Sequence, residues 1–387
     1  MGGNEMKSIK LRRSILSLIL IMTLVLTFTA CGGGSKDTPE INVEGCGIVH
    51  DDELHGIFIN RAIEDFNAMG FEYGDSVNIE FSNGYKLEDI PYYDGYYSEI
   101  RQAFLLGSPE YEALKVLINH GDCLWDVAEV DEGTTCTISM NEKGKYLDSQ
   151  QYLDLSYSDD RETFQTDEQF ANFREVTAGD IQPGRLYRAA SACDNSHKRP
   201  ETVDPLFESA GVNSMLDLTD SMERVEYYMS SVNFASDYFI FLKETGHVYP
   251  IELDMDYPSD EFRQKLAEGL SDLAGDEAPY AIFGVEGKDR TGFALMVVES
   301  LCGASYEEIR EDYMITYENY YGLTRKSDEK RYDFIVENVL DPMIRVMAGD
   351  DNLKVNKADL KPLAESYLES AGMTAEEIEE LRAKLTA

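Results

Sequence analysis

One short segment restricts the fold of this chain more than any other, because it joins a strand to a helix through a glycine-bearing loop. Residues 279–283 (PYAIF) form a short apolar run typical of a buried strand, and residues 293–301 (FALMVVESL) form a second one typical of a helix. The nine residues between them, 284–292, are GVEGKDRTG. Backbone N–H groups and a helix N-terminus converge in such a loop, which predicts an anion site. A tight structural turn is the alternative interpretation.

The loop resembles the signature of one bacterial branch of the protein tyrosine and dual-specificity phosphatases. That branch carries His-Cys-x-x-Gly-Lys-Asp-Arg-Thr-Gly, and residues 287–292 (GKDRTG) match its last six positions. A Walker A nucleotide loop is excluded, because an aspartate follows the Gly-Lys pair and the four-residue spacer before that pair is missing. Two upstream motifs of the same branch occur at residues 172–174 (NFR) and 184–188 (GRLYR). A third motif occurs in part at residues 217–223, which begin with DLT.

The resemblance covers residues 170–322 and implies an α/β fold, in which a parallel sheet is flanked by helices. The periodicity agrees, because strand-like and helix-like segments alternate around the loop, and this alternation favours parallel strands. We expect this domain over residues 165–350 and a C-terminal helical appendage over residues 351–387. The segments are strands at 185–190, 212–218 and 279–283, helices at 201–210 and from Ser259 onward, and helices opened by capping boxes at Ser305 and Thr374.

The resemblance implies a role for each residue of the loop. Arg290 would clamp two phosphoryl oxygens with its planar guanidinium, and Lys288 would add positive charge beside it. Three aspartates remain alternatives for the general acid, and each could equally be a plain surface carboxylate; they are Asp289, Asp254 and Asp256. The phosphate-binding residues that the resemblance implies are Val285, Glu286, Gly287, Lys288, Asp289, Arg290 and Thr291.

Gly284 stands where the family has its nucleophilic cysteine. The family's reaction needs a thiolate of lowered pKa to attack phosphorus, and glycine has no side chain. Two other thiols could be considered. Cys193 follows the strand at 185–190, whereas Cys302 lies about 18 Å along a helix from Arg290 and is expected in the core.

Three functions stay open from the sequence. The leading hypothesis is a pseudophosphatase that retains phosphate binding and recognises a phosphorylated protein, a phosphorylated peptide or a phosphoinositide head group. The second is a phosphatase that works weakly through water or through another nucleophile. The third is a surface protein that binds a ligand through its N-terminal domain. Whether the chain is an enzyme therefore depends on what replaces the thiol.

The N-terminus predicts export and lipid anchoring. Residues 1–30 combine four basic residues with an apolar run from Ser14, which is typical of a secretory signal. Residues 28–31 (FTAC) resemble a bacterial lipobox, which implies cleavage before Cys31 and a lipid on that residue. Residues 31–43 would then be a flexible linker, and the protein would be anchored to the membrane outside the cytoplasm. A cleaved signal with no lipid is the alternative.

The strongly acidic composition excludes one class of partner. The chain has 34 Lys+Arg against 74 Asp+Glu, a formal charge of −40; without residues 1–30 it has 30 against 73, a formal charge of −43. Because nucleic acid binding depends on neutralising phosphates with Lys and Arg, we expect no nucleic acid partner. We also expect no cofactor and no metal, because neither the histidines nor the cysteines show ligand spacing.

Residues 44–148 are predicted to form a small β-rich, α+β domain. Residues 77–81 alternate between polar and apolar side chains, and the SNG sequence that follows is a hairpin signal. Helices are predicted over residues 59–69 and 110–119. The odd number of cysteines beyond Cys31 leaves at least one thiol unpaired but allows one or two disulfides.

Two words in this domain resemble the C-terminal β-barrel of the SAM hydroxide adenosyltransferases. They are residues 71–77 (FEYGDSV) and 116–122 (VLINHGD), and they imply no nucleoside site. Four tyrosines nearby could stack on a ligand or form a packed loop; they are Tyr92, Tyr93, Tyr96 and Tyr97.

Overall fold

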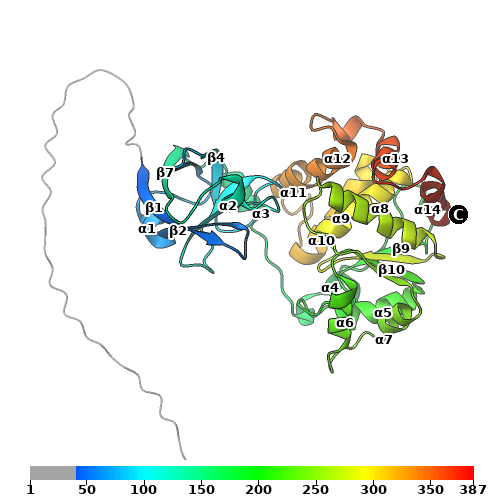
Figure 1. Ribbon diagram of the computed structural model, residues 1–387. Coiled ribbons are helices and arrows are strands. Elements are labelled where there is room, and N and C mark those ends of the chain that lie inside the picture. The colour runs from blue at the N-terminus through cyan, green and yellow to red at the C-terminus, as the bar shows by residue number, and fades with distance from the viewer. Residues whose placement is uncertain (1–40) are drawn as a thin grey trace, which may run out of the picture. The chain divides into compact units, whose positions relative to one another are not determined.

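The computed structural model describes residues 41–387. The predicted signal segment and Cys31 therefore lie outside the described residues. The described part contains a closed β-barrel followed by a five-stranded sheet covered by helices (Figure 1). The expectation of a mixed α/β chain with a β-rich N-terminal part is confirmed. Within residues 41–387, no helix combines the length and the apolar character that crossing a membrane requires.

The barrel has seven strands in the closed order β1-β2-β6-β5-β4-β3-β7, and all neighbours are antiparallel except β4 and β5. Its interior is filled by apolar side chains such as Ile57, Val77 and Ile138, each with no exposed surface. The strands are β1 (Asn42–Asp51), β2 (Gly56–Ala62), β3 (Ser76–Phe81), β4 (Lys86–Tyr93), β5 (Ala103–Leu106), β6 (Ala113–Ile118) and β7 (Thr135–Glu142), with short helices α1 (Ile63–Ala68), α2 (Leu124–Val127) and α3 (Leu147–Leu153).

The helix predicted over residues 110–119 is wrong, because that segment contains strand β6. Its apolar residues are buried on both faces of the strand, and a short continuous apolar run cannot be told from a helix by periodicity. The charge of Lys115 in the middle of the run is neutralised by Asp51 of β1, at 2.8 Å. This partner is 64 residues away in sequence, so local pattern gave no hint of it.

The sheet of the second part has the order β11-β10-β12-β9-β8. Neighbouring strands are parallel except β8, which runs antiparallel to β9. The register pairs Phe283 with Ala189 and Asp217, so these three strand ends meet at one edge of the sheet. The strands are β8 (Arg174–Glu175), β9 (Leu186–Ala189), β10 (Ser214–Asp217), β11 (Val248–Pro250) and β12 (Tyr280–Phe283).

Successive side chains of the central strands point to opposite faces of the sheet, and each face has its own helical cover. Met215 and Phe283 pack against α5, α6 and α7, whereas Leu216 and Ile282 pack against α8, α9 and the C-terminal helices. The helices are α4 (Asp167–Phe170), α5 (Pro200–Ala210), α6 (Met222–Met229), α7 (Asp237–Glu244), α8 (Asp260–Ala274), α9 (Asp289–Leu301), α10 (Tyr306–Tyr321), α11 (Glu329–Ile335), α12 (Asp341–Ala348), α13 (Leu360–Ser370) and α14 (Ala375–Thr386), with short helical turns η1 (Arg161–Thr163), η2 (Val336–Leu340) and η3 (Val355–Lys357).

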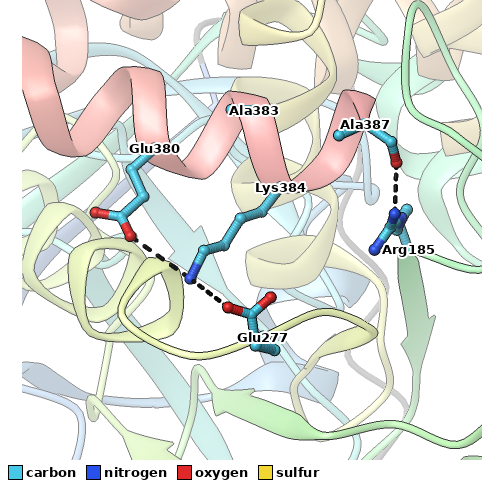
Figure 2. A pocket seen from close by; sticks show the side chains of 6 residues that line it. All are labelled: Arg185, Glu277, Glu380, Ala383, Lys384 and Ala387. Carbon is cyan, nitrogen blue, oxygen red and sulfur yellow. Dashed lines mark hydrogen bonds and ion pairs between the residues drawn. The ribbon is translucent and has the colours of Figure 1, made fainter.

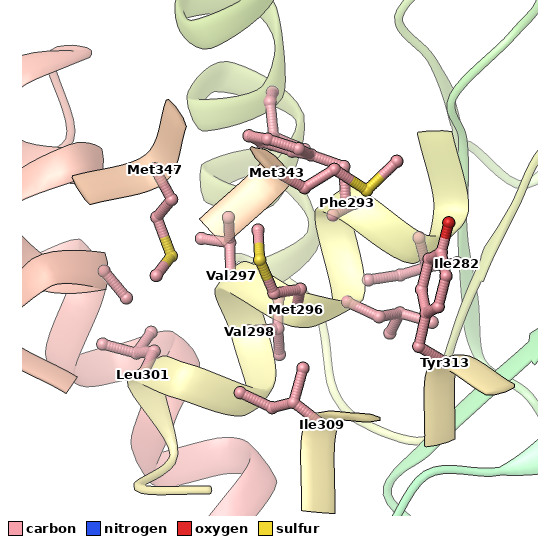
Figure 3. Close-up of a cluster of buried hydrophobic side chains, with 14 of the residues drawn as sticks. Ile282, Phe293, Met296, Val297, Val298, Leu301, Ile309, Tyr313, Met343 and Met347 are labelled. Atoms are coloured by element: carbon pink, nitrogen blue, oxygen red, sulfur yellow. The ribbon is translucent and has the colours of Figure 1, made fainter. Parts of the chain in front are cut away.

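Helix α9 is the centre of this second part. All of its residues from Thr291 to Leu301 are buried, as expected of a helix that is apolar all round. Figure 3 shows Phe293, Met296 and Leu301 surrounded by side chains of neighbouring helices. Helices α13 and α14 contribute Leu368 and Leu381 to the same core. The loop that precedes α9 is therefore attached to a helix that is buried on all sides.

Both predicted capping boxes are present. The side chain of Ser305 caps the first turn of α10 together with Glu308, and Thr374 does the same for α14 together with Glu377. Each box satisfies two of the backbone N–H groups that a helix N-terminus leaves without intrahelical partners.

Candidate functional site

The loop between β12 and α9 presents backbone N–H groups that the rest of the chain leaves free. Within residues 41–387, five of its amides donate to no protein group; they belong to Glu286, Lys288, Asp289, Arg290 and Thr291. Two of the remaining amides are used inside the structure, since Gly287 donates to Gly284 O and Val285 donates to Thr219 Oγ1. A row of free amides at the start of a 13-residue helix is an anion-binding arrangement.

The direction of these amides is fixed by what holds the carbonyl groups. The carbonyl of Gly287 accepts from Arg188 Nη2 at 2.8 Å and from Asn172 Nδ2 at 2.9 Å, both buried. In a trans peptide the C=O and the following N–H point in opposite directions, so the Lys288 amide faces away from these two side chains. The carbonyl of Val285 accepts from the Ser191 amide, which orients the Glu286 amide in the same manner.

An ion-pair network under the loop holds Arg188 in place. Asp312 of α10 binds Arg188 at 2.5 Å and Arg174 at 2.8 Å. Burial alone would raise the pKa of Asp312, but the two guanidinium groups hold it well below its usual range. Asn172, Arg174 and Arg188 belong to the two upstream sequence words, NFR and GRLYR. These two motifs therefore encode the support that lies behind the loop.

Gly287 must be a glycine for two independent reasons. Its φ of +64° lies in the left-handed region, and a Cβ atom at this position would lie 2.3 Å from the carbonyl oxygen of Ala189. The loop therefore turns directly against the end of strand β9.

Arg290 is the cation of the loop that remains available to a ligand. Its Nη1 donates to the carbonyl of Leu253 at 2.9 Å, and no carboxylate among residues 41–387 lies within ion-pair distance of it. Its side chain is half-buried, and its guanidinium carries further N–H donors in a fixed planar arrangement.

The charge of Lys288 is shared with two carboxylates. Its Nζ lies 3.5 Å from Asp289 and 3.7 Å from Glu286, and Tyr321 contacts it as well. Burial would lower the pKa of Lys288, yet these carboxylates raise it well above its usual value. The two acidic and two basic side chains of the loop have no net charge together. Because Lys288 is engaged by the carboxylates, the positive groups left for an anion are Arg290, the free amides and the N-terminal end of the helix dipole.

A tyrosine from the segment before the domain closes one side of the loop. Tyr157 donates to the Glu286 carboxylate, and its ring stacks on Tyr320 with 4.6 Å between centroids. Burial favours the neutral form of Glu286, but Lys288 and Tyr157 lower its pKa below the usual value. Tyr157 was not among the predicted site residues, because it lies far from the motif in the sequence.

The position of the missing nucleophile lies between two hydroxyl groups. A Cβ atom built on Gly284 would lie 2.9 Å from Thr219 Oγ1 and 3.2 Å from Thr291 Oγ1. The Thr291 hydroxyl is buried and has no hydrogen-bond partner among the described residues. Thr219, the second residue after β10, was not among the predicted site residues, although it lies in the partial DLT word.

The three predicted general acids are placed differently. Asp254 is exposed and one of its oxygens accepts from the Asp256 amide, whereas both oxygens of Asp256 accept from the guanidinium of Arg101, at 2.7 and 2.8 Å. Asp289 faces Lys288, and burial raises its pKa against the effect of that lysine. The segment that carries Asp254 reaches the loop through the carbonyl of Leu253, which Arg290 binds.

Neither alternative thiol fits the role of a nucleophile. Cys193 is 1% exposed, and its Sγ lies 3.5 Å from Asp217 and 3.6 Å from Asp220. Burial and these carboxylates raise the pKa of Cys193 well above its usual value, so the reactive thiolate is disfavoured. Cys302 ends α9 in the core, and burial raises its pKa to about 12.

Cys193, Asp217 and Asp220 are the one group of described side chains close enough together to be considered for a metal. Their hydrogen bonds are already satisfied within the chain. Asp217 accepts from the Thr219 and Asp220 amides and from Cys193, and Asp220 accepts from Tyr228. We therefore assign no metal to this group.

A pocket of about 310 Å³ lies at the opposite end of the sheet. Figure 2 shows that Lys384 points between Glu277 and Glu380, while Arg185 donates to the carbonyl of Ala387. Arg185 stands just before β9, whereas the loop follows the other end of the parallel strands. The cations of this pocket are engaged, so it offers no second anion site.

Comparison with known proteins gives one family match. The family model described as "Tyrosine phosphatase family" matches residues 167–387. Among solved structures, the catalytic domain of the PP-IP phosphatase SIW14 from S. cerevisiae shares 19% identity, over 46% of this chain and 91% of that chain, with a TM-score of 0.25. TpbA from P. aeruginosa shares 14% identity, over 55% of this chain and 94% of that chain, with a TM-score of 0.21. No curated protein matches.

Proposed function

This chain belongs to the tyrosine phosphatase family, and we propose that it is a member that binds phosphate groups without hydrolysing them. The observation that carries the proposal is the combination of an intact anion cradle with a glycine at the nucleophile position. Five free backbone amides and the N–H groups of Arg290 that do not bind Leu253 remain, while Gly284 offers no group that could attack phosphorus.

Binding should survive the loss of the thiol. Hydrogen bonds to a charged group contribute about 1.5–3 kcal/mol each, and the cradle offers several such bonds, including two from one guanidinium. In a catalytic member of the family the thiolate would repel an incoming phosphate dianion at close range. Without it, the same donors face the ligand without that opposing charge.

Hydrolysis should be very slow. Cys193 and Cys302, the two cysteines of this domain, are buried, and burial disfavours their thiolate forms. Neither can therefore replace the nucleophile. Removing the nucleophile of a covalent mechanism costs on the order of 10⁴–10⁶ in rate, and oxyanion stabilisation alone leaves only a small residue of catalysis.

The ligands that we propose are a phosphorylated protein or peptide, or a phosphoinositide head group. Aromatic rings beside the loop support a ligand with an organic part, since Tyr157, Tyr320 and Tyr321 lie next to Glu286 and Lys288. The lipobox-like sequence at Cys31 supports a position at the outer face of the cytoplasmic membrane, where such a receptor would meet its partner.

Calorimetric titration of residues 41–387 with inorganic phosphate, a phosphotyrosine peptide and soluble inositol phosphates tests the proposal. Arg290→Ala should weaken binding by about 10- to 150-fold, the equivalent of about 1.5–3 kcal/mol. Arg382→Ala is the matched control, because Arg382 is half-buried like Arg290 but lies on α14, where it pairs with Glu379. Turnover of p-nitrophenyl phosphate by the natural protein at a rate typical of an enzyme would contradict the proposal.

A further inference from the structure

We propose that the space left by the missing thiol is a binding position for one phosphate oxygen, and that the hydroxyls of Thr219 and Thr291 are its donors. This inference rests on the proposed function and extends it to the floor of the site. It assigns to Thr219, which lies outside the loop motif, a direct contact with the ligand.

The position of Thr219 is fixed by the backbone around it. Its amide donates to Asp217 Oδ1 at 3.0 Å, and its Oγ1 accepts from the Val285 amide at 3.2 Å. Its side chain is buried and lies at the floor of the loop, 2.9 Å from the place where a Cβ of residue 284 would be. Thr219 is therefore part of the loop's own hydrogen bonding and contacts the site directly.

The hydroxyl protons of both threonines lack acceptors. Thr219 Oγ1 uses a lone pair for Val285, and within residues 41–387 it donates to no atom. Thr291 Oγ1 is 1% exposed and makes no hydrogen bond at all in the same part of the chain. A buried hydroxyl that stays unpaired costs free energy, so two such groups around one space indicate that an acceptor belongs there.

The surroundings select the chemical class of that acceptor. The loop groups that the described chain leaves free are also donors, namely five backbone amides and the remaining N–H groups of Arg290, whereas the Glu286 and Asp289 carboxylates pair with Lys288. A ligand that satisfies donors on several sides must carry several acceptor oxygens in a compact arrangement. A tetrahedral phosphate group meets this requirement, as a free ion or as a monoester.

The inference changes how the ligand would be held. In a thiol enzyme of this family the floor is the nucleophile, and phosphorus faces it. In this chain the floor consists of two hydroxyl groups that donate hydrogen bonds. One phosphate oxygen would therefore point toward the floor, and the phosphorus atom would not face it directly. The bound phosphate would be a stable ligand, with no group in line to attack it.

Titration of residues 41–387 with inorganic phosphate and with phosphotyrosine tests the inference, using Thr219→Val, Thr291→Val and the double variant. Each single variant should weaken binding by about tenfold, and Thr219→Ser should restore most of the affinity. The melting temperature of Thr291→Val should not fall, because its hydroxyl has no partner to lose. Thr245→Val, at the residue that follows α7, is the matched control, since the Thr245 hydroxyl bonds only to backbone carbonyls of that helix.

The outcomes separate this inference from the function on which it rests. If Arg290→Ala abolishes binding but both valine variants bind as the natural protein does, water or nothing fills the floor, and the inference is wrong while the proposed function stands. If the natural protein binds neither probe, the proposed function itself fails. A loss of affinity that accompanies a fall in melting temperature in both valine variants, without recovery in Thr219→Ser, would also overturn the inference.

Discussion

Restoring the nucleophile should require two substitutions. In Gly284→Cys the new Cβ would lie 2.9 Å from Thr219 Oγ1, closer than such atoms normally approach. Thr219 is held by Val285 and Asp217, so it cannot turn away freely. Overpacking of this kind typically costs about 1–3 kcal/mol, which corresponds to about 5- to 150-fold in the population of the correct loop geometry. Thr219→Ala removes the hydroxyl and should relieve that cost.

The assay is steady-state hydrolysis of p-nitrophenyl phosphate by five proteins. The natural chain and Thr219→Ala should be inactive, Gly284→Cys weakly active, and Gly284→Cys/Thr219→Ala about 5- to 150-fold faster than Gly284→Cys. Adding Arg290→Ala to the double variant should abolish the gain. Equal rates for the single and double cysteine variants would refute the steric argument. A folded double variant that binds phosphate but never turns over would show that more than the nucleophile has been lost.

Three further predictions concern the support of the site and the thiols. Asp312→Asn should destabilise the domain by about 3–5 kcal/mol at pH 7, because it leaves two buried guanidinium groups without their carboxylate. Since the folded-state pKa of Asp312 is lowered, its stabilising contribution is present above the usual aspartate pKa and is lost as the pH falls. The difference in melting temperature between Asp312→Asn and the natural protein should therefore shrink below about pH 4. Cys193 should resist iodoacetamide at pH 8 in the folded protein and react after unfolding, and Cys193→Ser should keep full phosphate affinity. Cys46 and Cys136 are direct partners on β1 and β7, but both are buried and burial raises the pKa of Cys136 to about 12. They should therefore form a disulfide when the unfolded protein is refolded under oxidising conditions and not in the folded protein, with a gain of about 4–5 kcal/mol that mass spectrometry and melting in the presence and absence of reductant would check.

The loop was predictable from sequence because its chemistry is local. The strand, the glycines and the start of α9 all lie within residues 280–292, and the capping boxes of α10 and α14 are similarly short-range. The upstream words were recognised by resemblance, but their purpose was not. Arg188 and Asn172 hold the Gly287 carbonyl, and this contact depends on strand ends that meet at one edge of the sheet, which local sequence does not show.

Other features could not be predicted because they depend on distant contacts. Strand β6 forms because β2 and β5 pair with it on its two sides and Asp51 neutralises Lys115, and nothing within residues 110–119 shows these partners. Tyr92 and Tyr93 are buried in the barrel part, so half of the tyrosine cluster is packed rather than available for a ligand. Thr219 was not predicted because its place in the site follows from its short distance to the position that a Cβ of residue 284 would take, 65 residues later in the sequence.

The contact between Tyr157 and Glu286 has a consequence for dissecting the chain. The family match begins at residue 167, but a fragment cut there would lose the ring that stacks on Tyr320 and the hydroxyl that binds the loop carboxylate. Glu286 would then be free to compete for Lys288 and to face an arriving phosphate with an unshielded negative charge. A fragment that keeps these contacts of the loop must therefore begin before Tyr157, upstream of the start of the family match.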